Sequence, residues 1–187
     1  MTTDIKKIVL FGPESTGKSY LAQALATHYH TRFVPEYART YLELKHQLNL
    51  SSLDANSICT TDDIFPIVSG QILIEDEIIK HAHYLLLCDT NPLQTAVYVQ
   101  YYYNNTCTWL ENIINERVYH HYLLLNTDVP WVQDPLRDRP HHRQEIFNLF
   151  EKTLAQRGHT YTIVSGNYKQ RTELCIQTID RLLAIEK

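Results

Sequence analysis

Eight residues near the N-terminus constrain the fold more than any other part of the chain. They read Gly12-Pro13-Glu14-Ser15-Thr16-Gly17-Lys18-Ser19, between the apolar run 7–11 and a segment, 18–29, with helical spacing of apolar residues. A strand, a turn with glycines and a helix in this order bring successive backbone N–H groups to a helix N-terminus, where they can surround an anion. The octapeptide therefore predicts a phosphate-binding loop (P-loop) within an α/β domain.

The fixed residues of the motif define the expected nucleotide contacts. Gly12 and Gly17 carry no Cβ, so the backbone can turn sharply and come close to a phosphate. Lys18 is expected to reach the β- and γ-phosphates and to act in catalysis, and the Ser19 hydroxyl is expected to bind Mg²⁺. The predicted cofactors are therefore ATP and Mg²⁺. The residues expected to bind ATP in this segment are Gly12, Glu14, Ser15, Thr16, Gly17, Lys18, Ser19 and Tyr20.

Apolar strands alternate with helical segments along the rest of the chain. Strands are predicted at 7–11, 32–34, 84–88, 122–125 and 161–164, and helices at 18–29, 36–45, 92–103, 108–116, 143–156 and 168–185. Another helix is predicted to end at Lys80 after a cap at Thr61 or Asp62, following a polar loop over 47–61. Unbroken apolar strands indicate a parallel sheet with helices on both faces. Residues 1–187 are therefore expected to form a single P-loop domain, a three-layer α/β sandwich.

The composition of the chain argues against nucleic acids and membranes as binding partners. The formal net charge is −4 and the sequence pI is about 6.2, which argues against a non-specific nucleic-acid binder. No segment approaches the roughly 20 apolar residues that cross a bilayer, and the four cysteines form no Cys-x-x-Cys pair. We therefore expect a cytoplasmic protein with small-molecule partners and neither nucleic-acid nor membrane partners. A homo-oligomer stays open, because the tyrosine cluster 98–103 can belong to the core or to an interface.

One carboxylate stands where a P-loop enzyme carries its second acid. Asp89 follows the strand 84–88, and the carboxyl ends of parallel strands form the edge at which ligands bind. Asp89 is therefore expected to orient Mg²⁺ together with Ser19 and to act in catalysis. The alternative is that Asp89 only caps the helix that starts at Asn91-Pro92.

A second acid, beside an arginine, favours a small-molecule kinase. Glu36 follows the strand 32–34, where its carboxylate can accept the proton of an attacking hydroxyl, and Asp89 is the alternative base. Arg39 lies one helical turn further and is expected to hold the acceptor or the γ-phosphate. The alternative role for Glu36 is a favourable charge at a helix start. A GTPase is disfavoured because Asn126-Thr127-Asp128-Val129 lacks the lysine of a base-reading motif, and large ATPase machines need a longer chain.

The loop 129–143 is rich in proline, aspartate and arginine. It is expected to act as a short lid in which Arg137 and Arg139 stabilise charge on the transferring group, with Arg143 just beyond them. The alternative is a solvated loop held by Arg–Asp pairs.

Short stretches along nearly the whole chain resemble one family when taken in order. They are Gly12–Ser19, Glu36–Arg39, Gly70-Gln71, Asp89-Thr90, Trp131–Asp134 with Leu136-Arg137, and Ser165–Tyr168 with Arg171. Together they resemble the ribosylnicotinamide kinase domain of NadR and its stand-alone relatives, a branch of P-loop kinases. The resemblance implies a five-stranded parallel sheet of order 2-3-1-4-5 and ATP-dependent phosphorylation of the 5′-hydroxyl of nicotinamide riboside. It also implies an arginine-bearing lid at 137–143 and places Gly166 and Tyr168 beside the adenine.

The acceptor side departs from the family pattern at two positions. Substrate contacts are expected from Glu36, Tyr37, Arg39 and Asp89, but Pro35 and Glu77 stand where the family has aromatic side chains that stack on nicotinamide. The candidates to replace these aromatics are Tyr37, Tyr41 and Trp109. Two alternatives therefore stay open: a kinase for another nucleoside or a vitamin alcohol, and an ATP-binding regulatory protein.

Overall fold

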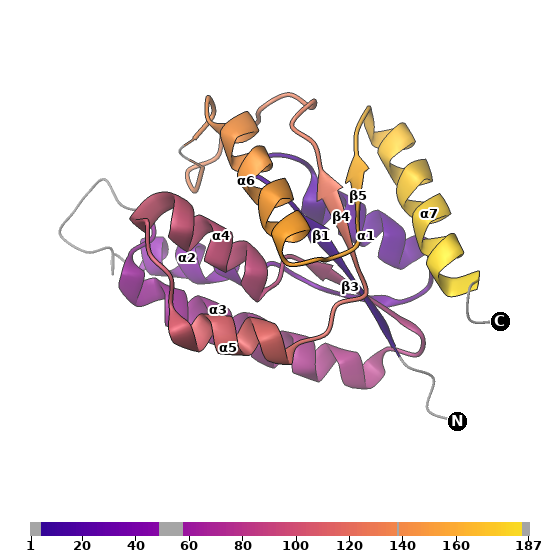
Figure 1. Cartoon of the computed structure of the whole chain (residues 1–187), viewed down its shortest axis with the longest axis horizontal. Coiled ribbons are helices and arrows are strands. Elements are labelled where there is room, and N and C mark those ends of the chain that lie inside the picture. The colour runs from indigo at the N-terminus through magenta and orange to yellow at the C-terminus, as the bar shows by residue number, and fades with distance from the viewer. Residues whose placement is uncertain (1–4, 49–57, 138, 185–187) are drawn as a thin grey trace.

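A computed structural model describes residues 5–48, 58–137 and 139–184 of the chain, and these residues form three layers (Figure 1). The middle layer is a sheet of five parallel strands in the order β2-β3-β1-β4-β5, which confirms the predicted order. The strands are β1 (Lys6–Phe11), β2 (Arg32–Val34), β3 (Leu85–Asp89), β4 (His121–Leu125) and β5 (Tyr161–Val164).

The helices begin and end close to their predicted positions. They are α1 (Lys18–His28), α2 (Tyr37–Gln47), α3 (Thr61–Ile78) with the 3₁₀ turn η1 (Ile79–His81), α4 (Pro92–Tyr103), α5 (Thr108–Glu116), α6 (Arg143–Gln156) and α7 (Tyr168–Ala184). Residues 49–57 of the predicted loop 47–61 lie outside the described residues, as does Ile185. The predicted cap of α3 is wrong, because Thr60 caps it in a reciprocal pair with Asp63.

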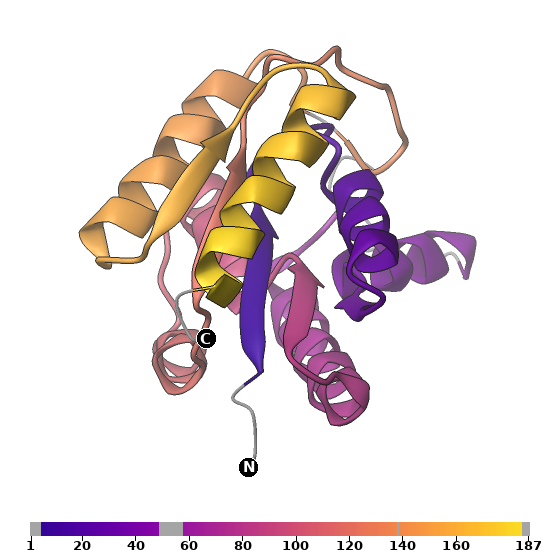
Figure 2. The ribbon, with the colours of Figure 1, turned by 90° about the vertical axis from the view of Figure 1, so that its right-hand side faces the viewer.

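Alternate residues of β1 face two separate hydrophobic cores. Ile8 and Leu10 pack with α1 and α7, while Val9 and Phe11 pack with α3, α4, α5 and α6. All four side chains are fully buried, as expected for a central strand covered on both faces. Figure 2 shows α7 and α6 on opposite sides of β5, as expected for helices that cover the two faces of the sheet. The three-layer sandwich is thus confirmed.

The parallel register brings the chemically important ends of three strands together. Leu10 of β1 lies opposite Asp89 of β3, and Phe11 lies opposite Leu124 of β4. The segments that follow β1, β3 and β4 therefore meet at one edge of the sheet. Within the described part of the chain, no helix combines the length and the apolar character needed to cross a membrane.

Candidate active site

The segment between β1 and α1 forms a tight loop whose backbone conformation and packing restrict which residues can occupy it. Gly12 and Gly17 have φ angles of 131° and 87°, and Ser15 also has a positive φ of 55°. A Cβ on Gly12 would lie 2.9 Å from the carbonyl oxygen of Leu125 in β4. The two glycines are therefore required by backbone conformation at both positions and by close packing at Gly12. The first turn of α1 contains no acidic residue, which leaves the positive end of the helix dipole available to an anion.

Lys18 lies over the loop rather than out in solvent. Its ammonium group donates hydrogen bonds to the carbonyl oxygens of Gly12 and Pro13, at 3.0 and 2.9 Å. The side chain is buried, whereas Ser19, the next residue, is exposed at the start of α1. The P-loop thus holds the Lys18 ammonium group against its backbone and leaves the Ser19 hydroxyl accessible to a ligand.

Asp89 is a buried carboxylate at the carboxyl end of β3. It is only 1% exposed, and its Oδ1 atom has no hydrogen-bond partner. Burial raises the pKa of Asp89 to about 6 and the charge of Glu36 adds to this, while Lys18 and the Ser19 hydroxyl oppose the increase. The capping alternative for Asp89 is wrong, because Asn91 caps α4 by accepting the N–H of Gln94 at 3.3 Å.

A cavity of about 480 Å³ opens from the P-loop toward α2, α3 and α4. Most of the predicted site residues line it: Glu14, Ser15, Thr16, Gly17, Lys18, Ser19, Tyr20, Glu36, Arg39, Arg137 and Arg139. Gly12 and Asp89 are buried and do not line it. One hollow therefore joins the expected phosphate site to both acidic and basic side chains from distant segments.

Glu36 is held at the cavity by a contact between two short stretches that are far apart in sequence. The N–H of Tyr37 donates to Oε1 of Gln71 at 2.8 Å, and the Gln71 amide donates to the carbonyl oxygen of Pro35 at 3.2 Å. The Tyr37 ring packs directly on Gly70, where a Cβ would lie 2.0 Å from Cε1 of the ring. Tyr37 itself does not line the cavity, so its contacts support the start of α2 rather than a ligand.

On the acceptor side, the aromatic residues of the cavity are not those that the sequence indicated. Tyr41 donates a hydrogen bond to Asp63, and Trp109 packs edge-on against Phe65, so neither lines the cavity. Glu77, near the end of α3, is exposed, pairs with Lys80 of η1 and does not line the cavity. The cavity is instead lined by tyrosines of α4, namely Tyr98, Tyr102 and Tyr103.

A helical spacing signal was available for these tyrosines. Gln94, Tyr98 and Tyr102 recur every four residues, so they share one face of α4, and α4 starts at the ligand-binding edge directly after Asp89. Burial, and then the charges of Glu14 and Glu36, raise the pKa of Tyr98 well above its usual value, so its hydroxyl stays protonated.

The loop 129–143 connects the P-loop to the opposite wall. The N–H of Val132 donates to the Ser15 hydroxyl at 2.8 Å, and Arg39 of α2 pairs with Asp134 at 2.7 Å. Arg139 lies 5.3 Å from the ring centre of Tyr102. Asp138 lies outside the described residues.

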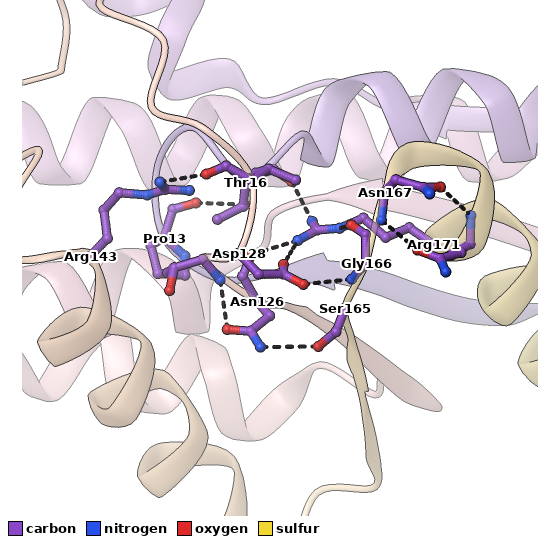
Figure 3. Close-up of polar contacts among 12 residues, drawn as sticks. Pro13, Thr16, Asn126, Asp128, Arg143, Ser165, Gly166, Asn167 and Arg171 are labelled. Atoms are coloured by element: carbon purple, nitrogen blue, oxygen red, sulfur yellow. Dashed lines mark hydrogen bonds and ion pairs between the residues drawn. The ribbon is translucent and has the colours of Figure 1, made fainter.

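Arg143 does not join Arg137 and Arg139 at the cavity, so the expectation of a lid arginine at this position is wrong. Its guanidinium is buried and donates to the carbonyl oxygen of Val129 at 2.9 Å. It also donates to the carbonyl oxygen of Ser15 at 2.9 Å (Figure 3). Arg143 therefore supports the P-loop from outside.

The segment expected beside the adenine lies next to the P-loop but outside the cavity. Tyr168 at the start of α7 packs against Tyr20 with ring centres 5.0 Å apart, and a Cβ on Gly17 would lie 3.2 Å from its ring. Gly166 and Tyr168 do not line the cavity. Their contact with adenine stays a prediction.

Comparison with known proteins agrees with this geometry. A sequence-family profile described as "AAA domain" matches residues 7–171, from the first strand to the last helix. The chain belongs to this family. It is also 25% identical over 187 residues to the trifunctional NAD biosynthesis/regulator protein NadR of Escherichia coli K12, and 24% identical over 183 residues to NadR of Salmonella typhimurium LT2. The predicted resemblance to NadR is thus confirmed.

The match to NadR covers nearly all of this AAA-family chain but less than half of the relatives. It covers 98% and 96% of the chain, and 44% and 43% of the two proteins. Among solved structures, NadR in complex with NR matches with a TM-score of 0.77 and 20% identity, over 95% of this chain and 49% of NadR. Thymidylate kinase from Ehrlichia chaffeensis matches with a TM-score of 0.64 and 14% identity over 95% of this chain and 98% of that one. At these identities the structures show a shared P-loop kinase fold.

Proposed function

We propose that this protein transfers the γ-phosphate of ATP to a hydroxyl of a small molecule. The acceptor to test first is the 5′-hydroxyl of nicotinamide riboside. The observation that carries the proposal is the shared cavity, in which the P-loop forms one wall and Glu36, Arg39 and the α4 tyrosines form the other. A hydrolase needs room only for water, whereas this cavity of about 480 Å³ has room for a second organic molecule beside the phosphates.

The nucleotide side is proposed to work through backbone N–H groups and two side chains. Lys18 would exchange its loop carbonyls for phosphate oxygens, and Ser19 with Asp89 would hold Mg²⁺. The residues fit this ion, because Oδ1 of the buried Asp89 lacks a hydrogen-bond partner and the Ser19 hydroxyl is close enough to the Asp89 carboxyl group to oppose the increase in its pKa. When bound, Mg²⁺ neutralises charge on the transferring phosphate.

The acceptor side is proposed to position a hydroxyl and remove its proton. Glu36 lines the cavity and so is better placed than the buried Asp89 to accept that proton. Arg39, Arg137 and Arg139 also line the cavity, where their guanidinium groups can stabilise charge on the transferring group. Positioning and charge stabilisation are the main requirements of phosphoryl transfer, because its transition state needs little covalent help from the protein.

Three observations bear on the identity of the acceptor. NadR was solved with NR bound, which makes nicotinamide riboside the natural first candidate for this relative. Tyr98 and Tyr102, whose rings stack with centres 6.0 Å apart, line the cavity and present aromatic surface to a planar base in place of the aromatic that Pro35 replaces. Arg139, however, already lies over the Tyr102 ring, and a positively charged nicotinamide would be repelled by it. Nucleosides with a neutral base should therefore be compared with nicotinamide riboside as acceptors.

The test is a coupled assay of ADP release with the purified chain, Mg-ATP and a panel of acceptors. The panel contains nicotinamide riboside, neutral purine and pyrimidine nucleosides, and a vitamin alcohol, with the phosphorylated product identified by mass. We expect one class of acceptor to stimulate ADP release, and Lys18→Ala and Ser19→Ala to abolish it. ADP release that no acceptor changes would contradict the proposal and favour the ATP-binding regulatory alternative.

A further inference from the structure

Two buried arginines contact the outer side of the P-loop, away from the cavity. Arg171 of α7 is fully buried, and its Nη1 donates to the carbonyl oxygen of Thr16 at 2.8 Å. Arg143, the first residue of α6, donates from Nη2 to the carbonyl oxygen of Ser15 at 2.9 Å. The two side chains approach the loop from opposite directions (Figure 3). They therefore bind consecutive carbonyl groups of the same loop.

Binding these carbonyls determines where the following N–H groups point. In a planar trans peptide the C=O of one residue and the N–H of the next point in opposite directions. When the carbonyls of Ser15 and Thr16 are held outward, the N–H groups of Thr16 and Gly17 must point inward, as an anion-binding nest requires. This conformation is costly to the free loop, because Ser15 has a φ of 55°, a region that residues with a side chain rarely adopt.

Each arginine is itself fixed by further acceptors. Arg171 donates from Nε to the carbonyl oxygen of Gly166 at 2.7 Å and from Nη2 to that of Asn126 at 2.9 Å, and it pairs with the Asp128 carboxylate. Asp128 in turn accepts the N–H of Gly166 at 2.6 Å. Arg143 has a second bond to Val129, and its guanidinium lies 5.8 Å from the ring centre of Trp131. The five donors of a planar guanidinium are spread over three nitrogens and can reach acceptors on opposite sides, whereas a lysine ammonium has its three donors on one nitrogen.

We propose that Arg143 and Arg171 are positioning residues that hold the P-loop in its phosphate-binding shape. Neither side chain lines the cavity, so both act through the backbone of residues 15–17. The inference rests on the proposed binding of a nucleoside triphosphate at the P-loop. Both arginines thus have a role in phosphate binding, whereas residues with a purely structural role would affect only the stability of the protein.

The experiment measures the binding of inorganic tripolyphosphate to the full chain by calorimetry, with the melting temperature of the free protein recorded in parallel. The test variants are Arg143→Lys and Arg171→Lys, which keep the charge but lose the fork of donors. Matched controls are Arg157→Lys, directly after the last residue of α6, whose partner is Glu111, and Arg181→Lys on α7, whose partner is the carbonyl oxygen of Gln177.

We expect each test variant to weaken tripolyphosphate binding about tenfold, because a charge-assisted hydrogen bond orients the nest, and the controls to change it less than about twofold. A lower melting temperature with unchanged affinity in both test variants would overturn the inference alone, since a purely structural role gives that result. Absence of binding to the wild-type chain would overturn the proposed function and this inference together. If Arg171→Lys does not fold, Arg143→Lys decides.

Discussion

The two walls of the cavity are built in different ways. The nucleotide wall is one continuous segment, 12–19, whose backbone forms the expected phosphate site and whose shape is supported from outside by Arg143 and Arg171. The acceptor wall is assembled from side chains of α2, α3, α4 and the loop 129–143. The difference teaches that phosphate recognition can be local in sequence, whereas recognition of the second molecule depends on how distant segments pack.

The largest effect is expected on the nucleotide wall. Lys18→Ala should reduce turnover about a thousandfold or more, because no other side chain of this loop can bring a positive charge to the phosphates. Steady-state kinetics with the best acceptor measure the loss. The control is Lys169→Ala, which removes a highly exposed lysine of α7 and should leave turnover unchanged. Substantial turnover in Lys18→Ala would break the comparison, because it would mean that the nucleotide wall is not the main site of charge stabilisation.

On the acceptor wall, Glu36→Gln should lower kcat about a hundredfold while leaving the KM for ATP close to that of the wild type. The amide has nearly the same shape as the carboxylate but cannot accept the proton. Glu77→Gln is the control, since Glu77 is exposed and paired with Lys80, and it should behave like the wild type. An unchanged kcat in Glu36→Gln would transfer the role of base to Asp89.

A smaller effect is expected from the tyrosine face of α4. Tyr102→Ala should raise the KM for the acceptor about tenfold and leave the KM for ATP unchanged, because the ring is proposed to stack on the acceptor alone. Tyr102→Phe keeps the ring and should remain near the wild type. A rise in both KM values for Tyr102→Ala would show that the two walls are not separate in function.

The smallest effect concerns the sheet that carries both walls. His121 of β4 is 8% exposed and bonds through its two ring nitrogens to Thr160 and Thr162. Burial lowers the pKa of His121 in the folded protein below its ordinary value of about 6.5. The unfolded chain therefore takes up the proton first, so this contribution to stability is complete above about pH 6.5 and is lost as the pH falls toward the folded pKa.

Thermal melting from pH 7.5 to pH 5.5 measures this loss as the difference between the wild type and His121→Gln, which should be about a few degrees. The difference is needed because the pKa of Asp89, raised to about 6, lies in the same range and stabilises the fold as the pH falls. His121→Gln should flatten the dependence, although burial also lowers the pKa of His159 and part of the slope will remain. The exposed His141→Gln should keep the full dependence. A slope that His121→Gln does not change would assign the acid sensitivity to other groups.

Much of the fold could be predicted because its strands and helices follow from short-range sequence patterns. The apolar runs of β1, β3 and β4 and the helical spacing of α1 are set by short-range sequence, and their bounds were found within about two residues. The predicted cap of α3 failed because Thr60, Thr61 and Asp62 all have the composition of a cap. Only the reciprocal bond between Thr60 and Asp63 distinguishes them.

The acceptor wall was predicted only in part. Glu36 and Arg39 were found because they directly follow β2 at the ligand-binding edge, which the sequence defines. The tyrosines of α4 were missed, and Tyr41 and Trp109 were considered instead, because whether an aromatic ring faces a cavity or a neighbouring helix depends on packing between helices.

The sequence by itself determined the P-loop, the order of strands and helices, and the acids and arginines gathered at one edge of the sheet. Only the tertiary structure decided that Arg143 supports the loop instead of facing the cavity, and that Arg171 reaches Thr16 across 155 positions of the chain. The physical reason is range. Backbone conformation and strand or helix periodicity depend on neighbouring residues, whereas a buried guanidinium binds whichever carbonyl groups the packed fold brings to it.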